Sequence, residues 1–240
     1  TAIMGITDDY VQWGLNRANR KKNDKYDKAF PLGYISQPPE KNSIIEADKF
    51  WDSKGVSPEN YDFVVCCVTN ITKWSDIITV IKAFKRIHDL GKKALFVLCG
   101  SGDDLENCQA ITKGDPAILL PGWVNAAQIY VLMRRSLIGI DPLLERYDFL
   151  ATINNKAIEY LSAGLPIISC PNHGVLSELL QEHQCGMSYP TGNTDYLVNL
   201  LCDIYDNRGL LKTMSQNAFQ LYKEKFTAEN PDKLTSLPNF

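Results

Sequence analysis

The residues best suited to chemistry stand at the start of a predicted helix in the last third of the chain. The segment 152–170 reads TINNKAIEYLSAGLPIISC. Asn154, Asn155 and Lys156 form the helix start, and Glu159 lies one turn further. Free backbone amides at a helix start bind anions without any dedicated side chain. Acidic residues are favoured in a first turn, so a bound phosphate would account for the positive charge of Lys156.

The carboxylate of Glu159 can reach the same edge of the predicted fold and accept hydrogen bonds from two hydroxyls of a ribose. A solvated glutamate, or one paired at i+3 with Lys156, is the structural alternative. On the first interpretation, this helix start receives a phosphate and a sugar ring.

Two other candidates follow predicted strands. Gly100 opens the turn GSGDDL, which is consistent with both a plain tight turn and a ligand-binding loop. Leu105 stands where the dinucleotide fingerprint needs its third glycine, and no carboxylate follows about 20 residues on. A nicotinamide cofactor is therefore disfavoured. Lys73 follows the first long strand, where a cation would meet a phosphate; a solvated surface lysine is the alternative.

Strands and helices alternate from residue 61 onward. The apolar runs DFVVCCVT, ALFVLC, AILLPG, LIGIDP, PIISC and GMSYP predict buried strands, with amphipathic helices between them. One helix begins at Ser75 or Asp76, with a buried stripe that runs from Ile77 to His88. The alternation predicts an α/β fold, a doubly wound parallel sheet of the Rossmann-like kind. Ligands of such folds bind at the carboxyl ends of the strands.

Residues 1–57 read differently from residues 58–240, and we place a domain boundary between them. The first part contains a helix candidate, DDYVQWGLNRA, a basic run over 20–28 typical of a solvated loop, a short strand FPLGY and a second helix over 43–54. We predict a lead-in segment followed by one Rossmann-like domain that includes the C-terminal helices.

Composition excludes several classes of function. The chain has 240 residues, 45% of them hydrophobic, and its 25 basic and 28 acidic residues give a net charge of −3, so no basic field indicates a nucleic-acid partner. No apolar run approaches the roughly 20 residues of a membrane helix, and no signal peptide is recognisable.

The cysteines indicate a reducing compartment. There are seven, an odd number, several lie in apolar runs, and no C-x-x-C pair occurs. With only three histidines, a zinc site is disfavoured and no metal is expected. Buried free thiols are preferred to disulfides, which favours a cytoplasmic location.

Several motifs in order resemble one family. NKAIEYLSAGLPIIS, NHGVLSELL and CGMSYPTGNTDYL resemble the carboxyl-terminal half of retaining, group-1 glycosyltransferases of the GT-B type. FVLCGSGDDLE, ILLPGWVNAAQIYVLM and LIGIDPLLE fit the same family in the same order, so the resemblance covers residues 61 to about 226. The segments AIMGITDDYVQWGLNRA and FPLGY look like the end of the amino-terminal domain and its crossing to this one.

The resemblance implies a transferase that uses a nucleotide-diphosphate sugar and retains the anomeric configuration, in bacterial surface polysaccharide synthesis. No cofactor or metal is needed in such enzymes. The acceptor, a glycan or a lipid-linked glycan, would bind a missing N-terminal domain, so this piece should bind donor without transferring sugar alone. The full-length protein would be cytoplasmic, with peripheral association at the inner face of the membrane.

The resemblance also implies roles for individual residues but identifies no catalytic residue. Glu159 matches the glutamate that binds the ribose, and Lys73 the lysine that pairs with the diphosphate. The amides of Asn155 and Lys156 match the phosphate-binding helix start. The predicted donor-binding residues are Lys73, Gly100, Gly122, Trp123, Asn154, Asn155, Lys156, Glu159 and Gly174. In this set the turn 122–124 holds the base, and Asn154 with the turn 173–175 sets the sugar.

Two departures from the family pattern leave a second interpretation open. Ala151 stands where a first glutamate would contact the donor sugar, and Cys66 and Cys67 where a glycine and an arginine would precede the lysine. Lys156 could compensate for the missing cation. The alternative to an enzyme is a non-catalytic nucleotide-sugar sensor or pseudoenzyme.

Overall fold

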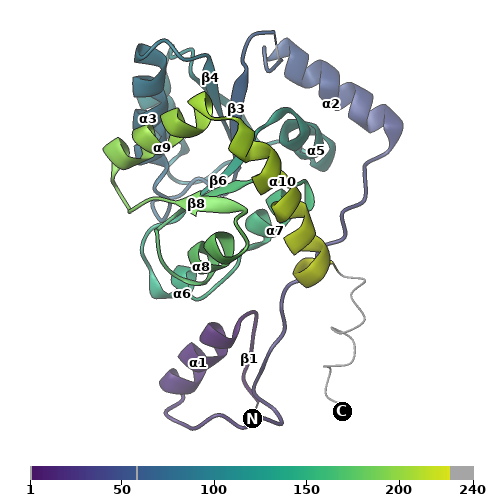
Figure 1. The fold of residues 1–240 in the computed structure, drawn as a ribbon, viewed down its shortest axis with the longest axis vertical. Coiled ribbons are helices and arrows are strands. Elements are labelled where there is room, and N and C mark those ends of the chain that lie inside the picture. Colours follow the sequence, from purple (N-terminus) through teal and green to yellow (C-terminus); the bar gives the residue numbers. More distant parts are fainter. Residues whose placement is uncertain (1, 58, 228–240) are drawn as a thin grey trace.

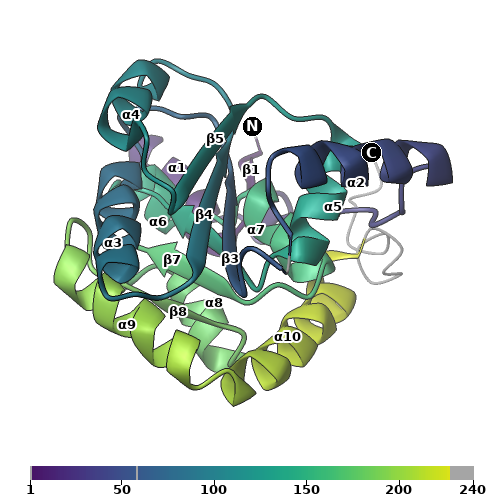
Figure 2. The ribbon, with the colours of Figure 1, turned by 90° about the horizontal axis from the view of Figure 1, so that it is seen from above.

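A six-stranded parallel sheet forms the centre of the computed structural model, which describes residues 2–57 and 59–227. The strands lie in the order β5-β4-β3-β6-β7-β8, so the order reverses between β3 and β6 (Figures 1 and 2). The prediction of a doubly wound, Rossmann-like sheet is confirmed. The strands are β3 (Phe63–Val68), β4 (Ala94–Cys99), β5 (Ile118–Gly122), β6 (Ile138–Pro142), β7 (Ile167–Cys170) and β8 (Gly186–Ser188).

Helices cover both faces of this sheet, each over its own apolar core (Figure 2). One face carries α3 (Ile77–Asp89), α4 (Leu105–Thr112) and α9 (Thr194–Asp206). The other carries α5 (Ala126–Arg135), α7 (Asn155–Ser162), α8 (Val175–Glu182) and the end of α10 (Gly209–Leu221). The short α6 (Tyr147–Leu150) follows β6, and α10 continues as the π-helical turn η1 (Tyr222–Phe226).

Strand β3 shows why the two cores form. Its side chains alternate, so Cys66 packs in one core and Cys67 in the other, and both are fully buried. All seven cysteines carry free thiols, as predicted. On α3 the predicted stripe is buried at Ile77, Ile81 and Phe84, but His88 is exposed. His88 lies in the last turn of the helix, close to where α3 ends at Asp89.

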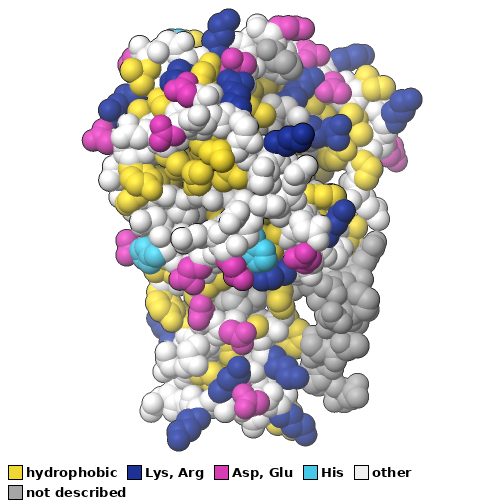
Figure 3. All heavy atoms as spheres, in the orientation of Figure 1, with side chains coloured by type: hydrophobic (Ala, Val, Ile, Leu, Met, Phe, Trp, Pro, Cys, Tyr) yellow, Lys and Arg dark blue, Asp and Glu magenta, His cyan; other side chains and the backbone are white. Residues whose placement is uncertain are grey.

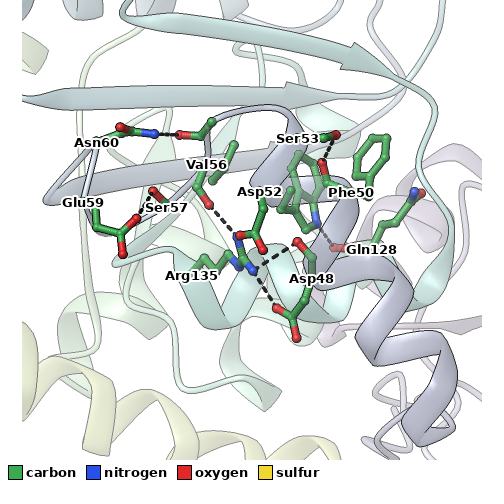
Figure 4. A network of polar contacts seen from close by, with 12 residues as sticks. Asp48, Phe50, Asp52, Ser53, Val56, Ser57, Glu59, Asn60, Gln128 and Arg135 are labelled. Atoms are coloured by element: carbon green, nitrogen blue, oxygen red, sulfur yellow. Dashed lines mark hydrogen bonds and ion pairs between the residues drawn. The ribbon is translucent and has the colours of Figure 1, made fainter.

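The second helix of the lead-in, α2 (Lys41–Ser53), packs against α5 (Figure 4). Trp51 is fully buried, and its indole Nε1 donates to the carbonyl of Gln128 at 2.8 Å. The Arg135 guanidinium lies 2.7 Å from both the Asp48 and the Asp52 carboxylates. α2 therefore belongs to the core of the Rossmann-like domain, although it precedes the boundary that we predicted after residue 57; residue 58 lies outside the described residues.

The rest of the lead-in is a small separate unit below the sheet in Figure 1. Two short parallel strands, β1 (Met4–Gly5) and β2 (Lys28–Ala29), flank α1 (Asp8–Arg17). The predicted strand FPLGY is wrong as placed, because β2 ends before it and Tyr34 alone forms an isolated bridge, with Thr227. The amide of Phe30 still donates to the carbonyl of Gly5 in β1, at 2.8 Å, whereas the amide of Tyr34 donates to Phe226 in η1.

The surface shown in Figure 3 carries hydrophobic side chains between α9 and the edge strand β8. They line a groove of about 520 Å³ whose residues include Met187, Tyr196, Leu200, Leu210 and Met214. In the described part of the chain, no helix is long and apolar enough to span a bilayer.

Candidate functional site

The loops after β3, β4 and β5 enclose a pocket at the carboxyl edge of the sheet. Its volume is about 350 Å³. This edge lies beside the point where the strand order reverses, which is where doubly wound folds bind ligands. The pocket is lined by Val68, Thr69, Asn70, Gly100, Ser101, Trp123, Val124 and Ile129.

Glycines at two of these loops meet different requirements. A side chain at Gly100 would place its Cβ 1.8 Å from the carbonyl oxygen of Thr69, so only glycine lets the two loops touch. Gly100 thus serves as a tight turn and also lines the pocket. Gly122 has room around it but a φ of +84°, which glycine adopts without strain. This turn leaves Trp123 74% exposed at the pocket rim.

Helix α7 begins beside the pocket. Asn154 caps it, because its Oδ1 accepts from the amide of Ala157 at 2.9 Å. Its Nδ2 donates to Asp141 Oδ2 at 2.6 Å. Within residues 2–57 and 59–227, the amides of Asn155 and Lys156 have no hydrogen-bond acceptor. Two backbone donors and the positive end of the helix dipole are therefore free for an anion.

The side chain of Lys156 turns under the helix rather than out to solvent. Its Nζ lies 2.7 Å from Asp141 Oδ1 and 3.2 Å from Thr69 Oγ1. Burial disfavours the ammonium, but the Asp141 carboxylate outweighs this and raises the pKa of Lys156. A protein carboxylate thus accounts for the cation in the first turn, for which we had expected a phosphate. Sequence reasoning missed Asp141, whose only signal is one acid inside the apolar run LIGIDP.

Glu159 lies on a second cavity, of about 520 Å³, between α5, α7, α10 and the segment over 34–39. Burial raises the pKa of Glu159, and a hydrogen bond with Tyr34 partly offsets the increase. Ile129 lines both this cavity and the first pocket. The two spaces therefore adjoin along α5, with Glu159 in the second.

The remaining candidates lie around the same edge. Lys73 is exposed in the loop after β3. This loop contacts the loop after β6, because the amide of Leu144 donates to the carbonyl of Trp74 at 3.0 Å. Gly174 has a φ of +94°, and a Cβ there would lie 2.8 Å from the carbonyl oxygen of Leu150. The neighbouring His173 is half exposed, with Nε2 3.3 Å from Glu145.

The two adjacent cysteines lie in the first long strand, as the sequence predicted. Cys66 and Cys67 are fully buried inside β3, whereas the rim of the pocket is formed by Thr69 and Asn70. Ala151 is buried at the end of α6, and its carbonyl accepts a hydrogen bond from the Thr7 hydroxyl of the lead-in.

Metal ligands do not gather in the part of the chain that the structure describes, where no group of three or more His, Cys, Asp or Glu could hold an ion. The groups suited to an anion in this region are the free amides at the start of α7. Lys73 is the exposed cation on the loop that follows β3.

Comparison with known families agrees with this architecture. The family described as "Glycosyl transferases group 1" matches residues 62–207, which is more than half of the chain. The chain belongs to this family. A comparison with curated protein sequences found no match.

Solved structures of glycosyltransferases share the fold. HepE of Anabaena, solved with UDP, is 14% identical with a TM-score of 0.75, and the match covers 98% of this chain and 64% of HepE. A variant of TarM of S. aureus, solved with fondaparinux, α-GlcNAc-glycerol and UDP, is 12% identical with a TM-score of 0.74, covering 100% of this chain and 44% of TarM. The C-terminal domain of LpcC from Francisella tularensis is 15% identical with a TM-score of 0.63. This match covers 80% of this chain and 96% of the LpcC domain.

These identities show the fold alone. The chain spans 64% of HepE and 44% of TarM, but the match covers 96% of the LpcC C-terminal domain. This chain therefore corresponds to the carboxyl-terminal half of a GT-B glycosyltransferase, the half that its sequence resembles.

Proposed function

We propose that this chain supplies the donor-binding part of a glycosyltransferase. The donor is a nucleotide-diphosphate sugar, and the acceptor is a glycan or a lipid-linked glycan held by a further domain. The sugar is transferred with retention, at the cytoplasmic face of a membrane, in bacterial surface polysaccharide synthesis. The single observation that carries the proposal is the pocket at the carboxyl edge of the sheet, with the unpartnered amides of Asn155 and Lys156 beside it.

The positions of the residues support the following proposed roles. The diphosphate lies against the start of α7, where amides and the helix dipole favour negative charge. Lys73 provides the exposed cation, and the turn at Gly122 and Trp123 borders the base. Glu159, one turn along α7, accepts the ribose hydroxyls. Asn154 and Gly174 lie toward the sugar, because both line the small space that follows β6 and β7.

The alternative is a nucleotide-sugar sensor without turnover. It is favoured by Ala151, which puts a methyl group where the family pattern has a sugar-binding carboxylate. An enzyme releases nucleotide from the donor when acceptor is added, whereas a sensor binds the donor without release.

Calorimetric titration of the chain with UDP, GDP and ADP tests the donor site. We expect the best of these nucleotides to bind, and E159Q to weaken its binding by roughly 10- to 100-fold, as expected for hydrogen bonds to a charged group. The 2′,3′-dideoxy form of the same nucleotide should bind E159Q and the unaltered chain equally. The matched control is E182Q, which changes an exposed glutamate on α8 and should leave nucleotide binding unchanged. Equal loss of both nucleotide forms would place Glu159 away from the ribose.

A further inference from the structure

The segment that joins the lead-in to the Rossmann-like domain lines one side of the cavity that holds Glu159. Tyr34 lines the cavity of about 520 Å³ from one side and Glu159 from another. The two side chains are 125 residues apart in the sequence, and nothing in the sequence pattern connects them.

The backbone at Tyr34 is held firmly on the C-terminal turn η1. Its amide donates to the carbonyl of Phe226 at 2.9 Å, and its carbonyl accepts from the Tyr222 hydroxyl at 2.8 Å. The same hydroxyl of Tyr222 accepts from the amide of Ser36 at 3.2 Å. These bonds fix the crossing segment over α7, with the Tyr34 side chain lining the cavity.

We propose that Tyr34 is a positioning residue for Glu159: its phenol donates a hydrogen bond that orients the carboxylate toward the ribose of the donor. The inference rests on the proposed function, because it deepens the role of Glu159 there. An ionised carboxylate has about four acceptor sites, so one bond from Tyr34 leaves capacity for both ribose hydroxyls.

Charges around the pair support this arrangement. Burial and the neighbouring Glu159 carboxylate raise the pKa of Tyr34 to about 12, so the phenol keeps its proton and remains a donor. The other titratable groups that line the cavity are Tyr130 and Arg134 of α5, and the Tyr222 hydroxyl donates to the backbone carbonyl of Tyr34. The described residues that α10 contributes to the cavity carry no charge; they are Ser215, Gln216 and Phe219.

The sign of the pH effect follows from these contacts. Burial raises the pKa of Glu159 and the Tyr34 hydrogen bond lowers it, so removing the hydroxyl raises that pKa further. Because the ribose needs the carboxylate, nucleotide affinity falls as pH drops through this pKa. Without Tyr34, the affinity should be lost at a higher pH.

The test measures nucleotide affinity from pH 5 to 8.5 for the unaltered chain, Y34F, E159Q and the double variant. The probe is whichever of UDP, GDP and ADP binds most tightly. We expect Y34F to weaken binding about 5- to 20-fold near pH 6, less at pH 8, and to shift the pH midpoint upward by about half a unit. In the E159Q background, Y34F should no longer shift the pH midpoint, because no carboxylate remains there to titrate.

Y130F is the matched control, since Tyr130 lines the same cavity and its hydroxyl accepts from Arg134 at 3.4 Å. Thermal unfolding checks that Y34F keeps its fold. Binding that depends on Glu159 but is identical in Y34F and the unaltered chain would overturn the role of Tyr34 alone. No nucleotide binding, or binding indifferent to E159Q, would overturn the proposed function and this inference with it.

Discussion

At the scale of single residues, α7 shows how position on a helix decides what a charge does. Lys156 turns toward the sheet and pairs with Asp141, while Glu159, three residues on, faces the cavity beside Tyr34. The i+3 pairing of these two charges, the simple alternative from the sequence, does not occur. Lys156 is held in an ion pair with Asp141, and Glu159 lines a cavity.

The buried pair makes Lys156 a stability residue. We expect K156M to lower the free energy of unfolding by about 3–5 kcal/mol, because it leaves the Asp141 carboxylate buried without its cation. The variant K156M/D141N should regain most of this loss. Urea unfolding at pH 7 provides the measurement, with K212M on the exposed side of α10 expected to stay within about 0.5 kcal/mol.

The pH dependence of this contribution has a definite sign. The pKa of Lys156 is raised in the folded chain, chiefly by Asp141 acting against burial. The stabilisation is therefore complete below the unfolded pKa of about 10.4 and disappears only as pH rises through the folded value. A loss below 1 kcal/mol for K156M at pH 7 would show that the pair is not as tightly held as its distances indicate.

At the scale of elements, the packing of α7 on the sheet depends on one glycine in β6. A Cβ at Gly139 would lie 2.4 Å from the ring of Tyr160, which is almost fully buried. The Tyr160 hydroxyl in turn accepts from the amide of Val68 at 3.0 Å. Gly139 thus lets α7 come close enough to hold the end of β3, whose last residue lines the pocket.

Replacing Gly139 with Ala should cost about 1–3 kcal/mol, because the buried ring has to move from its place against the strand. G209A is the matched control: nothing lies within 4 Å of a Cβ at the first residue of α10, and we expect a gain of about 0.5 kcal/mol from the stiffer unfolded chain. Thermal unfolding of both variants distinguishes the effects. Equal midpoints would mean that the ring at Tyr160 has more freedom than the structure shows.

At the scale of the whole molecule, the segment between the lead-in and the sheet packs on the Rossmann-like domain at two places. The chain leaves the small β1–α1–β2 unit, runs along η1 at Tyr34 and then forms α2 on the outside of α5 (Figures 1 and 4). α2 contributes the fully buried Trp51 to the larger core, and its Asp48 and Asp52 carboxylates pair with Arg135 of α5.

Truncation tests where the folding unit begins. A chain that starts at residue 41 keeps α2 and should unfold in one cooperative transition. A chain that starts at residue 58 loses Trp51 and both carboxylate partners of Arg135, and we expect it to be less stable by about 3–5 kcal/mol. Circular dichroism during thermal unfolding makes the comparison. Equal stability of the two would support the predicted boundary after residue 57.

The sequence by itself determined the doubly wound sheet, the free thiols and the helix that begins at Asn155 behind its Asn154 cap. Each of these depends on local pattern: apolar runs such as FVVCCV, alternating with amphipathic helices, are typical of buried strands, and Asn is a preferred residue at a helix start. The family resemblance was recognisable for the same reason, because its motifs occupy continuous stretches.

Only the tertiary structure decided which charges meet. Asp141 reaches Lys156 because β6 and α7 end at the same edge of the sheet, and Tyr34 reaches Glu159 because η1 holds the crossing segment over α7. These pairs join side chains 15 and 125 residues apart, on different elements, and their contact depends on how those elements pack. Sequence spacing carries no record of that packing, so the pairing of Lys156 and the neighbour of Glu159 could not be found before the fold was known.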